Sequence, residues 1–189
     1  MPTTPRLARV VTVDRWDAGT LGAHLDDLVA VYREAFLEVF EDDPERAEAE
    51  RRPTIERHLR TGGVRGVAAV ERECLLGFGY GYHGAPGQWW HDVVRSALDP
   101  AEADRWLGDC FEVVELHVRP RAQGRGLGRR LLHELLATAT ERTSALSALD
   151  DPELPARRLY AAEGFRPLLT GFRFPGGTKP FAVLVRDLR

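Results

Sequence analysis

The sequence predicts a mixed α/β fold in which helices flank a central sheet, and two features lead to that prediction. Short runs rich in β-branched and aromatic residues, typical of strands, alternate with stretches whose apolar residues recur every three or four positions, as in amphipathic helices. One uninterrupted stretch, residues 111–139, combines a strand, a glycine-rich loop and a helix. At 189 residues the chain suits one domain covering residues 1–189, since about 150 residues is a typical allotment.

The chain begins with one predicted strand and two predicted helices. Residues 9–15 are β-branched and alternating, which favours a strand, and Asp17 or Thr20 is a suitable cap for the helix that follows. Residues 45–59 favour a second, more charged helix, interrupted or reset at Pro53 because a proline ring cannot donate an amide hydrogen. Apolar residues at helical spacing mark the first helix: Leu21, Leu25, Leu28, Tyr32, Ala35, Phe36, Val39 and Phe40.

Residues 64–70 and 75–82 are predicted strands joined by a turn at residues 71–73. In the second strand glycines alternate with Phe78, Tyr80 and Tyr82, so one face is aromatic and the other is bare. Because glycine weakens a strand unless something approaches it closely, we expect a helix or a ligand against the bare face. The aromatic face is interpreted either as core packing or as substrate contact.

A long connection, residues 84–109, separates this strand from the next one. It contains two short helical patterns, the first with Trp89 and Trp90 and the second beginning at Asp99 and Pro100. Most connections run about four to six residues, so one of this length is a candidate for a functional lid. Two adjacent tryptophans cannot share a narrow helical stripe, so one of them is expected either in a binding cleft or in surface or dimer packing.

The stretch of residues 111–139 carries the strongest functional signal. Residues 111–118 read as a largely buried strand, which Arg119 and Pro120 end. From Leu127 onward the apolar residues occupy one half of a helical wheel. The glycine-rich loop at residues 123–128 stands at the start of that helix, where unpaired amides and the helix dipole favour a phosphate.

Three known kinds of anion-binding motif are compared with the sequence of this loop. A nucleotide P-loop needs a Gly-Lys-Ser or Gly-Lys-Thr ending, and the chain has a single lysine, Lys179. A dinucleotide fingerprint needs its glycines hard against the strand, but five residues separate Val118 from Gly124, although Asp150 lies near the offset of a ribose-binding acid. The third pattern is Gln123-x-x-Gly126-x-Gly128 after a strand that ends in Val-x-Pro.

The last third of the chain completes the sheet. Residues 144–149 are a predicted strand, and residues 154–163 a helix with Gly164 as its C-terminal cap. Residues 165–174 and 180–188 are predicted to pair as antiparallel strands around a turn at residues 175–177.

Two of these patterns resemble the GCN5-related N-acetyltransferase (GNAT) superfamily. The first is the Gln123 to Gly128 loop with its strand and helix, which resembles the segment that holds the pyrophosphate of acetyl-coenzyme A. The second is the run A-x-x-L-Y-x-x-x-G-F at residues 156–165. The resemblance implies a mostly antiparallel twisted sheet of about six to seven strands, splayed at the cofactor cleft and flanked by helices. Residues 153–155 depart from the family, in which many members carry an asparagine before the late helix.

The resemblance also implies the chemistry. An amine attacks the thioester of acetyl-coenzyme A directly, and the acetyl group passes through a tetrahedral intermediate. The central strand separates from residues 144–149, its backbone at Leu116 and Val118 pairs with pantetheine, and the Leu116 amide faces the thioester oxygen. The expected cofactor-binding residues are Leu116, His117, Val118, Gln123, Gly124, Arg125, Gly126, Leu127, Gly128 and Arg129.

Tyr160 is the expected general acid for the leaving thiolate, and Glu112 and Glu115 are the candidate bases. On a regular strand Glu112 shares a face with Leu116 while Glu115 lies opposite, but a β-bulge would reverse that parity. His117 is a third candidate, because a histidine titrates near neutral pH. The sequence leaves the choice among the three open.

The expected acceptor is a small cationic primary amine with an apolar part. A carboxylate fringe of Glu34, Glu38 and Glu41 would attract a cation. The resemblance places the pocket on the first two helices and the long connection, which gives the candidate residues Tyr32, Phe36, Phe40, Tyr80, Tyr82, Trp89 and Trp90.

Composition limits the remaining possibilities. The net charge of −3 gives no basic footprint for nucleic acid, and Cys74 and Cys110 fit neither a disulfide framework nor a metal motif. No apolar run has signal-peptide or membrane-span length, so we expect a cytoplasmic protein, and the dominance of arginine indicates a GC-rich bacterial genome. A homodimer through the C-terminal strands or the tryptophans stays open. The alternative function is a catalytically silent acyl-coenzyme A binding or sensing module.

Overall fold

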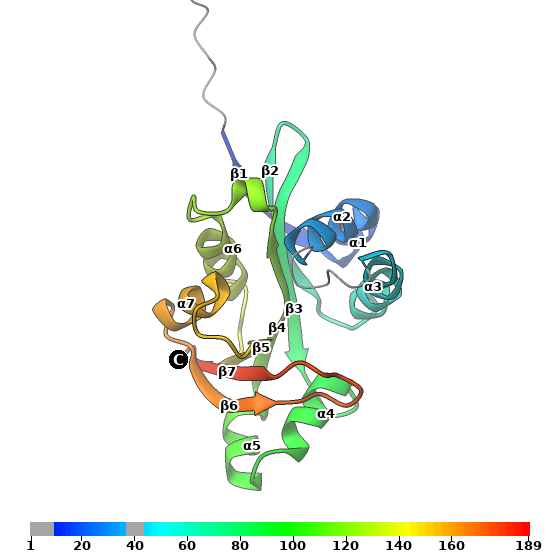
Figure 1. The fold of residues 1–189 in the computed structure, drawn as a ribbon. Coiled ribbons are helices and arrows are strands. Elements are labelled where there is room, and N and C mark those ends of the chain that lie inside the picture. The colour runs from blue at the N-terminus through cyan, green and yellow to red at the C-terminus, as the bar shows by residue number, and fades with distance from the viewer. Residues whose placement is uncertain (1–9, 37–43) are drawn as a thin grey trace, which may run out of the picture.

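A computed structural model describes residues 10–36 and 44–189 of the protein, with side chains for residues 10–36 and 51–189. The described chain forms a seven-stranded sheet in the order β1-β2-β3-β4-β5-β7-β6, in which only the β4–β5 pair is parallel (Figure 1). The predicted mixed, mostly antiparallel sheet is therefore confirmed. The strands are β1 Thr12–Asp17, β2 Arg65–Glu71, β3 Cys74–Gly84, β4 Cys110–Val118, β5 Thr143–Leu149, β6 Arg166–Phe172 and β7 Phe181–Asp187.

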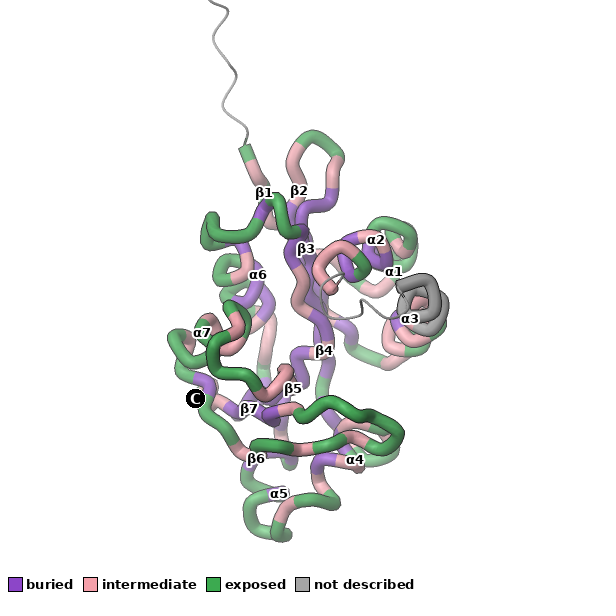
Figure 2. Tube along the Cα trace, in the orientation of Figure 1, coloured by how far each residue is buried: buried purple, intermediate pink, exposed green. Residues whose placement is uncertain are grey.

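Helices cover both faces of this sheet (Figure 1). One face carries α1 (Ala18–Ala23), α2 (Leu25–Phe36) and α3 (Pro44–Leu59), and the other carries α6 (Leu127–Leu136) and α7 (Pro155–Ala162). The long connection forms α4 (Trp89–Ser96) and α5 (Pro100–Leu107) beside β6 and β7. Figure 2 shows the buried positions gathered along the strands and the exposed ones on the outer helix surfaces.

Two expectations for the first helices are wrong. The single helix from Leu21 is divided into α1 and α2, because His24 leaves helical geometry and stacks its ring on Trp16 with the ring centroids 4.5 Å apart. Helix α3 continues through Pro53, whose ring lies on the exposed side while Ile55 is fully buried against the sheet. The predicted cap at Asp17 is confirmed, since its carboxylate accepts from the Thr20 amide at 2.8 Å.

The alternating strand β3 packs differently on its two faces. A Cβ atom on Gly77 would lie 3.1 Å from Leu131 Cδ1, and one on Gly79 would lie 2.8 Å from Leu116 Cδ1. Helix α6 therefore packs against the bare face. Of the two expectations for this face, a helix or a ligand, the helix is the one that the structure shows. On the other face Phe78 and Tyr80 are fully buried against α2 and α3, which confirms core packing for these two aromatics.

The sheet opens between its two parallel strands. Strands β4 and β5 pair only where residues 110–112 face residues 143–145, and no pairing continues beyond Glu112 and Ala145. From that point the described parts of β4 and β5 have free inner edges, which form the predicted splay. Unpaired strand edges present backbone donors and acceptors that a ligand can use.

Helices α4 and α5 are packed elements. Val94 of α4 and Trp106 and Leu107 of α5 are buried against β5 and β7, in one cluster with Val183 and Val185. Asp99 caps α5 by accepting from the amides of Ala101 and Glu102, each at 3.0 Å. The connection is thus packed against the sheet beside β5 and β7.

Candidate active site

The glycine-rich loop enters helix α6 through two left-handed residues. Gly124 and Gly126 both have φ near +73°, and a Cβ atom on either would meet nothing within 4 Å. Their requirement for glycine is therefore conformational, because other residues are strained at this φ. Gly128 is different, since its Cβ would lie 3.4 Å from Leu159 Cδ2 and so crowd the contact between α6 and α7.

The start of helix α6 is open to a ligand. Residues 123–126 are exposed, and Gly126, the N-cap residue, has no side chain to accept from the first amides. The first bond of the helix runs from the Arg130 amide to the Gly126 carbonyl, so the amides before it lack intrahelical partners. Such amides, together with the dipole of α6, are an arrangement that favours an anion.

Side chains around the loop divide into two groups. Gln123 donates to the Val118 carbonyl at 2.9 Å and so ties the loop to the end of β4. Arg129 is held by Glu163 of α7 at 2.7 Å, which leaves its guanidinium only partly available for a phosphate. Arg125 and Leu127 flank the loop, the first exposed and the second buried under α6.

Tyr160 projects from α7 into the core cluster that also holds Val118, Leu127 and Leu146. Its ring is buried and meets Phe165 edge to face, with centroids 5.8 Å apart. Burial raises the pKa of Tyr160 to about 12, so the hydroxyl keeps its proton at neutral pH. No residue in the described part of the chain makes a hydrogen bond to that hydroxyl, which leaves it free to donate to a ligand.

A β-bulge places both candidate carboxylates on one face. Tyr80 lies opposite Glu115, but Gly81 lies opposite Val113, so Val114 has no partner on β3. Glu112, opposite Tyr82, and Glu115 therefore share the aromatic face that α3 covers, and Leu116 lies on the α6 face. The regular-strand expectation that Glu112 shares a face with Leu116 is wrong for this reason.

Glu115 is fully occupied by neighbouring side chains. It is 3 % exposed, its Oε1 atom forms an ion pair with Arg51 of α3, and its Oε2 atom accepts from Nε2 of His117. Burial, together with the charge of Arg51, lowers the pKa of His117 to about 3, so the imidazole is neutral. Both oxygens of Glu115 are therefore engaged, and His117 is a weak base.

Glu112 is the opposite case. It is equally buried at 3 %, yet its Oε2 atom has no hydrogen-bond partner in the described structure. Burial raises the pKa of Glu112 to about 8, far above that of an ordinary carboxyl. An unpartnered buried oxygen of this kind is costly unless a ligand meets it, which makes Glu112 a candidate functional residue.

Aromatic side chains surround Glu112 on this face. Tyr82 lies directly across the strand pair from it, and Tyr80 lies within hydrogen-bond distance of His58, with Oη and Nδ1 3.2 Å apart. Burial, aided by the charges of Arg51 and Arg57, lowers the pKa of His58 to about 4, so this neighbour is neutral. Burial also raises the pKa of both tyrosines well above the usual range.

The other predicted acceptor residues lie in two further places. Tyr32 and Phe36 enclose the ring of His117, each with its centroid 5.2 Å away. Trp90 donates from Nε1 to the Ser147 hydroxyl on the splayed half of β5 at 3.2 Å. Trp89 is 59 % exposed and stacks beside Phe174 of the β6–β7 connection. The six candidates that the structure describes therefore do not form one pocket wall.

The predicted carboxylate fringe is only partly described. Glu34 forms an ion pair with the buried Arg119, which also donates to the Leu75 carbonyl at 2.7 Å. That carboxylate is neutralised, so the expectation of a free negative charge there is wrong. Glu38, Glu41 and Phe40 lie outside the described residues.

Two residues of the site had no sequence prediction, Arg51 and His58. Both lie on the inner side of α3 with Ile55, at positions i, i+4 and i+7 of one helical stripe. Their spacing indicates that the three residues share one face of the helix. In a helix this rich in charge, however, the sequence does not indicate which polar residues face the sheet.

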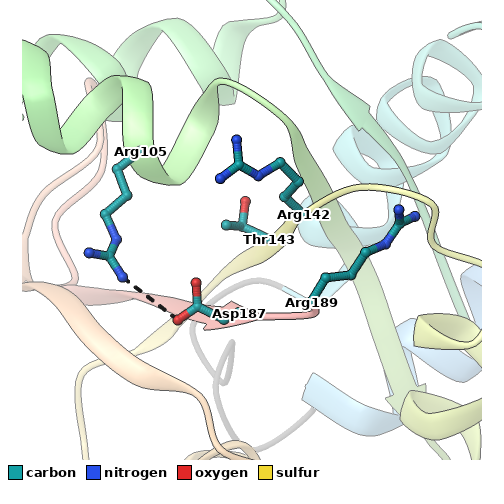
Figure 3. A pocket seen from close by; sticks show the side chains of 5 residues that line it. All are labelled: Arg105, Arg142, Thr143, Asp187 and Arg189. Atoms are coloured by element: carbon teal, nitrogen blue, oxygen red, sulfur yellow. Dashed lines mark ion pairs between the residues drawn. The ribbon is translucent and has the colours of Figure 1, made fainter.

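A separate cavity of about 340 Å³ lies at the other end of β5, lined by Arg105, Arg142, Thr143, Asp187 and Arg189 (Figure 3). Arg105 reaches from α5 to Asp187, with N and O atoms 3.9 Å apart, and Arg189 donates to the Thr140 carbonyl. Thr143 is the first residue of β5, where that strand is still paired with β4. The cavity is thus remote from the splayed half of the sheet.

Two kinds of feature are absent from the described residues. They contain no group of three or more histidine, cysteine, aspartate or glutamate side chains that could hold a metal ion. No helix among them has the length and apolar character needed to cross a membrane.

Comparison with known proteins identifies relatives for this arrangement. Residues 25–165 match the model of the acetyltransferase (GNAT) family. The chain is 35 % identical over 193 residues to the GCN5-like protein acetyltransferase Rv2170 of Mycobacterium tuberculosis, with 87 % of this chain and 91 % of that protein covered.

Solved structures show the same fold. A structure assigned to the GNAT family from Desulfovibrio desulfuricans has a TM-score of 0.67 at 17 % identity, covering 95 % of this chain and 100 % of that one. PaiA N-acetyltransferase from Thermoplasma acidophilum, in complex with coenzyme A, has a TM-score of 0.63 at 12 % identity, with 94 % and 99 % covered. Identities this low show likeness of fold alone, whereas the family model and the mycobacterial relative show descent. The chain therefore belongs to the GNAT family of acetyltransferases.

Proposed function

We propose that the protein transfers the acetyl group of acetyl-coenzyme A to a primary amine, with Glu112 as general base and Tyr160 as general acid. The observation that carries the proposal is Glu112 itself, a buried carboxyl with an unpartnered oxygen beside the point where β4 and β5 separate. An anion site stands at the far end of the same opening. We further propose that residues 1–189 act as one domain.

The donor side of the cleft suits a coenzyme A thioester. The amides of residues 123–128 and the dipole of α6 would hold the pyrophosphate, and the free inner edge of β4 at Leu116 and Val118 would pair with pantetheine amides. Coenzyme A in the Thermoplasma relative supports this assignment. Residues 153–155, which precede α7, lack the asparagine that many family members carry there. On the protein's side, the assignment therefore depends on the glycine-rich loop.

Glu112 is the base that the surroundings favour. An amine substrate arrives as an ammonium, since an ordinary lysine has a pKa of about 10.4. A carboxylate with a pKa of about 8 is a stronger base than an ordinary one, and its free Oε2 atom can accept the proton. Glu115 and His117 are poorer candidates because Glu115 is paired with Arg51, and a pKa of about 3 makes His117 a weak base.

The proton balance assigns a role to Tyr160. The neutral amine attacks the thioester carbonyl, the carbon–sulfur bond breaks, and the departing thiolate takes the proton of the Tyr160 hydroxyl. The nitrogen loses its second proton as the amide forms, and that proton restores the tyrosine. One proton, held by Glu112, is released to solvent in each turnover.

The acceptor is proposed as a cationic primary amine with an apolar part. Tyr82, Tyr80 and the neutral His58 offer ring faces and edges beside Glu112, and rings of this kind attract ammonium groups. A lysine side chain of a protein is a second candidate, because the mycobacterial relative is named a protein acetyltransferase. Trp89, exposed beside Phe174, offers an apolar surface to such a protein.

The test is coenzyme A release from acetyl-coenzyme A in the presence of small amines, amino acids and lysine peptides, with the wild type and Glu112→Gln. Amine-dependent release that falls in the variant supports the proposal. Binding of acetyl-coenzyme A without release for any acceptor would favour a silent acyl-coenzyme A sensor. An acceptor panel in which only anionic compounds react would contradict the cationic amine.

A further inference from the structure

Arg51 connects the helical layer to the strand that carries the proposed base. It lies on the inner face of α3 with Ile55, and its guanidinium stands over the Tyr32 ring, 4.3 Å from the centroid. The same guanidinium forms the ion pair with Glu115. One side chain thus joins α2, α3 and β4.

Glu115 stands immediately after the bulge of β4. The unopposed residue is Val114, so the position of the bulge decides which face Glu115 and every later side chain of the strand occupy. If the bulge were lost, Glu115 would turn toward α6, where Leu131 and Leu135 are fully buried. A carboxylate has no partner among such residues, and burying it there would be costly.

The pair is enclosed on the side where it now lies. His117 donates to the second oxygen of Glu115, and the rings of Tyr32, Phe36 and Phe78 surround His117 with centroids 5.2, 5.2 and 5.5 Å away. A buried ion pair contributes little net stability, but it strongly favours the one arrangement in which both charges are satisfied.

We propose that Arg51 is a positioning residue for acetyl transfer: by binding Glu115 it fixes the bulge at Val114, and so fixes the direction of the free β4 amides beyond the bulge relative to Glu112, which is held by its pairing with Tyr82 and Ala145. This inference rests on the proposed function, because the geometry that Arg51 fixes matters only if β4 carries the reaction. Arg51 itself does not touch the reacting atoms.

The experiment compares Arg51→Met, Arg51→Lys, Glu115→Gln and the double variant Arg51→Met/Glu115→Gln. Arg52→Met is the matched control, since Arg52 is the next residue on α3 and pairs with Asp26 at the surface. For each protein we would measure kcat, KM for acetyl-coenzyme A, thermal stability, and hydrogen exchange of peptides covering residues 110–118.

We expect Arg51→Met to lower kcat on the order of 100-fold, because a displacement of about 1 Å in reacting groups has that effect. KM for acetyl-coenzyme A should change little, and exchange in β4 should accelerate. Arg51→Lys keeps the charge and should recover part of kcat. Arg52→Met should match the wild type in every measurement.

The double variant separates positioning from folding. It removes the uncompensated buried charge, so its stability should recover, while kcat should stay near that of Arg51→Met because nothing fixes the bulge. If kcat recovers together with stability, or if Arg51→Met has wild-type kcat and wild-type exchange, the inference is overturned. If the wild type acetylates no amine while exchange in β4 still depends on Arg51, the proposed function fails and the structural part of the inference stands.

Discussion

The proposed donor and acceptor sides, near the point where β4 and β5 separate, differ in how far apart their residues lie along the chain. The donor side comes mainly from residues 116–128, one continuous strand, loop and helix start. The acceptor side brings together Glu112 of β4, Tyr82 of β3 and His58 of α3, with Trp90 of α4 at its edge. Local backbone geometry forms the first side, and packing of distant segments forms the second.

The two sides also use charge differently. The donor side offers backbone amides and solvent-exposed residues, which suits a phosphate that stays partly hydrated. The acceptor side is buried, and within it two glutamates three positions apart have opposite environments. Glu115 is paired with Arg51 and His117, whereas Glu112 has an oxygen with no partner in the described structure. Chemistry that needs a raised pKa is therefore expected on the acceptor side.

The largest effect is expected from Glu112→Gln, which removes the proposed base without changing shape. We expect kcat to fall on the order of 1,000-fold, within the range attributed to general acid–base catalysis. The binding constant for acetyl-coenzyme A should change less than about threefold, because the variant leaves the donor side intact. Single-turnover rates and calorimetric binding of acetyl-coenzyme A would check both. Unchanged kcat would show that another group or a water chain takes the proton.

The pH dependence of the same reaction gives an independent check. Since only the ionised form of Glu112 can act as base, the rate should rise with pH and level off above about 8. In Glu112→Gln the residual rate should lose that inflection. A wild-type profile with an inflection near pH 4 instead would indicate an ordinary carboxylate.

Tyr160→Phe should have the next largest effect. Loss of the hydroxyl removes the proton donor for the thiolate, so we expect kcat to fall about 100-fold. The ring packing on Phe165 is retained, and thermal stability should therefore stay close to that of the wild type. Acceptors should all be affected alike, since the donor thiolate is common to them. A loss that depends on the acceptor would place Tyr160 on the acceptor side instead.

Gly126→Ala tests the donor side alone. A side chain at φ +73° costs roughly 1–2 kcal/mol, so the loop should distort and KM for acetyl-coenzyme A should rise about tenfold. The acceptor KM should stay the same. Gly62→Ala is the matched control, because Gly62 is not left-handed and a Cβ atom there meets nothing within 4 Å. Equal effects of the two substitutions would remove the special role of the loop.

The smallest effect is a gain in stability in Glu112→Gln. Glu112 has a folded-state pKa of about 8, above that of the unfolded chain, so the folded state holds the extra proton between the two values. Stability attributable to this group is full below the unfolded pKa and declines as the pH rises to about 8. Glu112→Gln should therefore melt a few degrees higher than the wild type at pH 8 and about equally at pH 4.

The sequence by itself determined the elements whose cause is local. Strand β4, the left-handed glycines at 124 and 126 and the apolar stripe of α6 lie in one continuous stretch. Gly164 also ends α7 where expected, at φ +80°. Periodicity, turn chemistry and propensity act over a few residues, so these features follow from order along the chain. The separation of β4 from β5 was expected from the family resemblance. The structure agrees with it, because β4 pairs with β5 only at residues 110–112.

The tertiary structure alone decided which carboxylate is free. That outcome depends on a one-residue bulge between β3 and β4, and on Arg51 reaching from α3 to Glu115 rather than to Glu112. The pairing of Glu34 with Arg119 has the same origin. Such choices are made by contacts between residues tens of positions apart, which a local sequence pattern does not record.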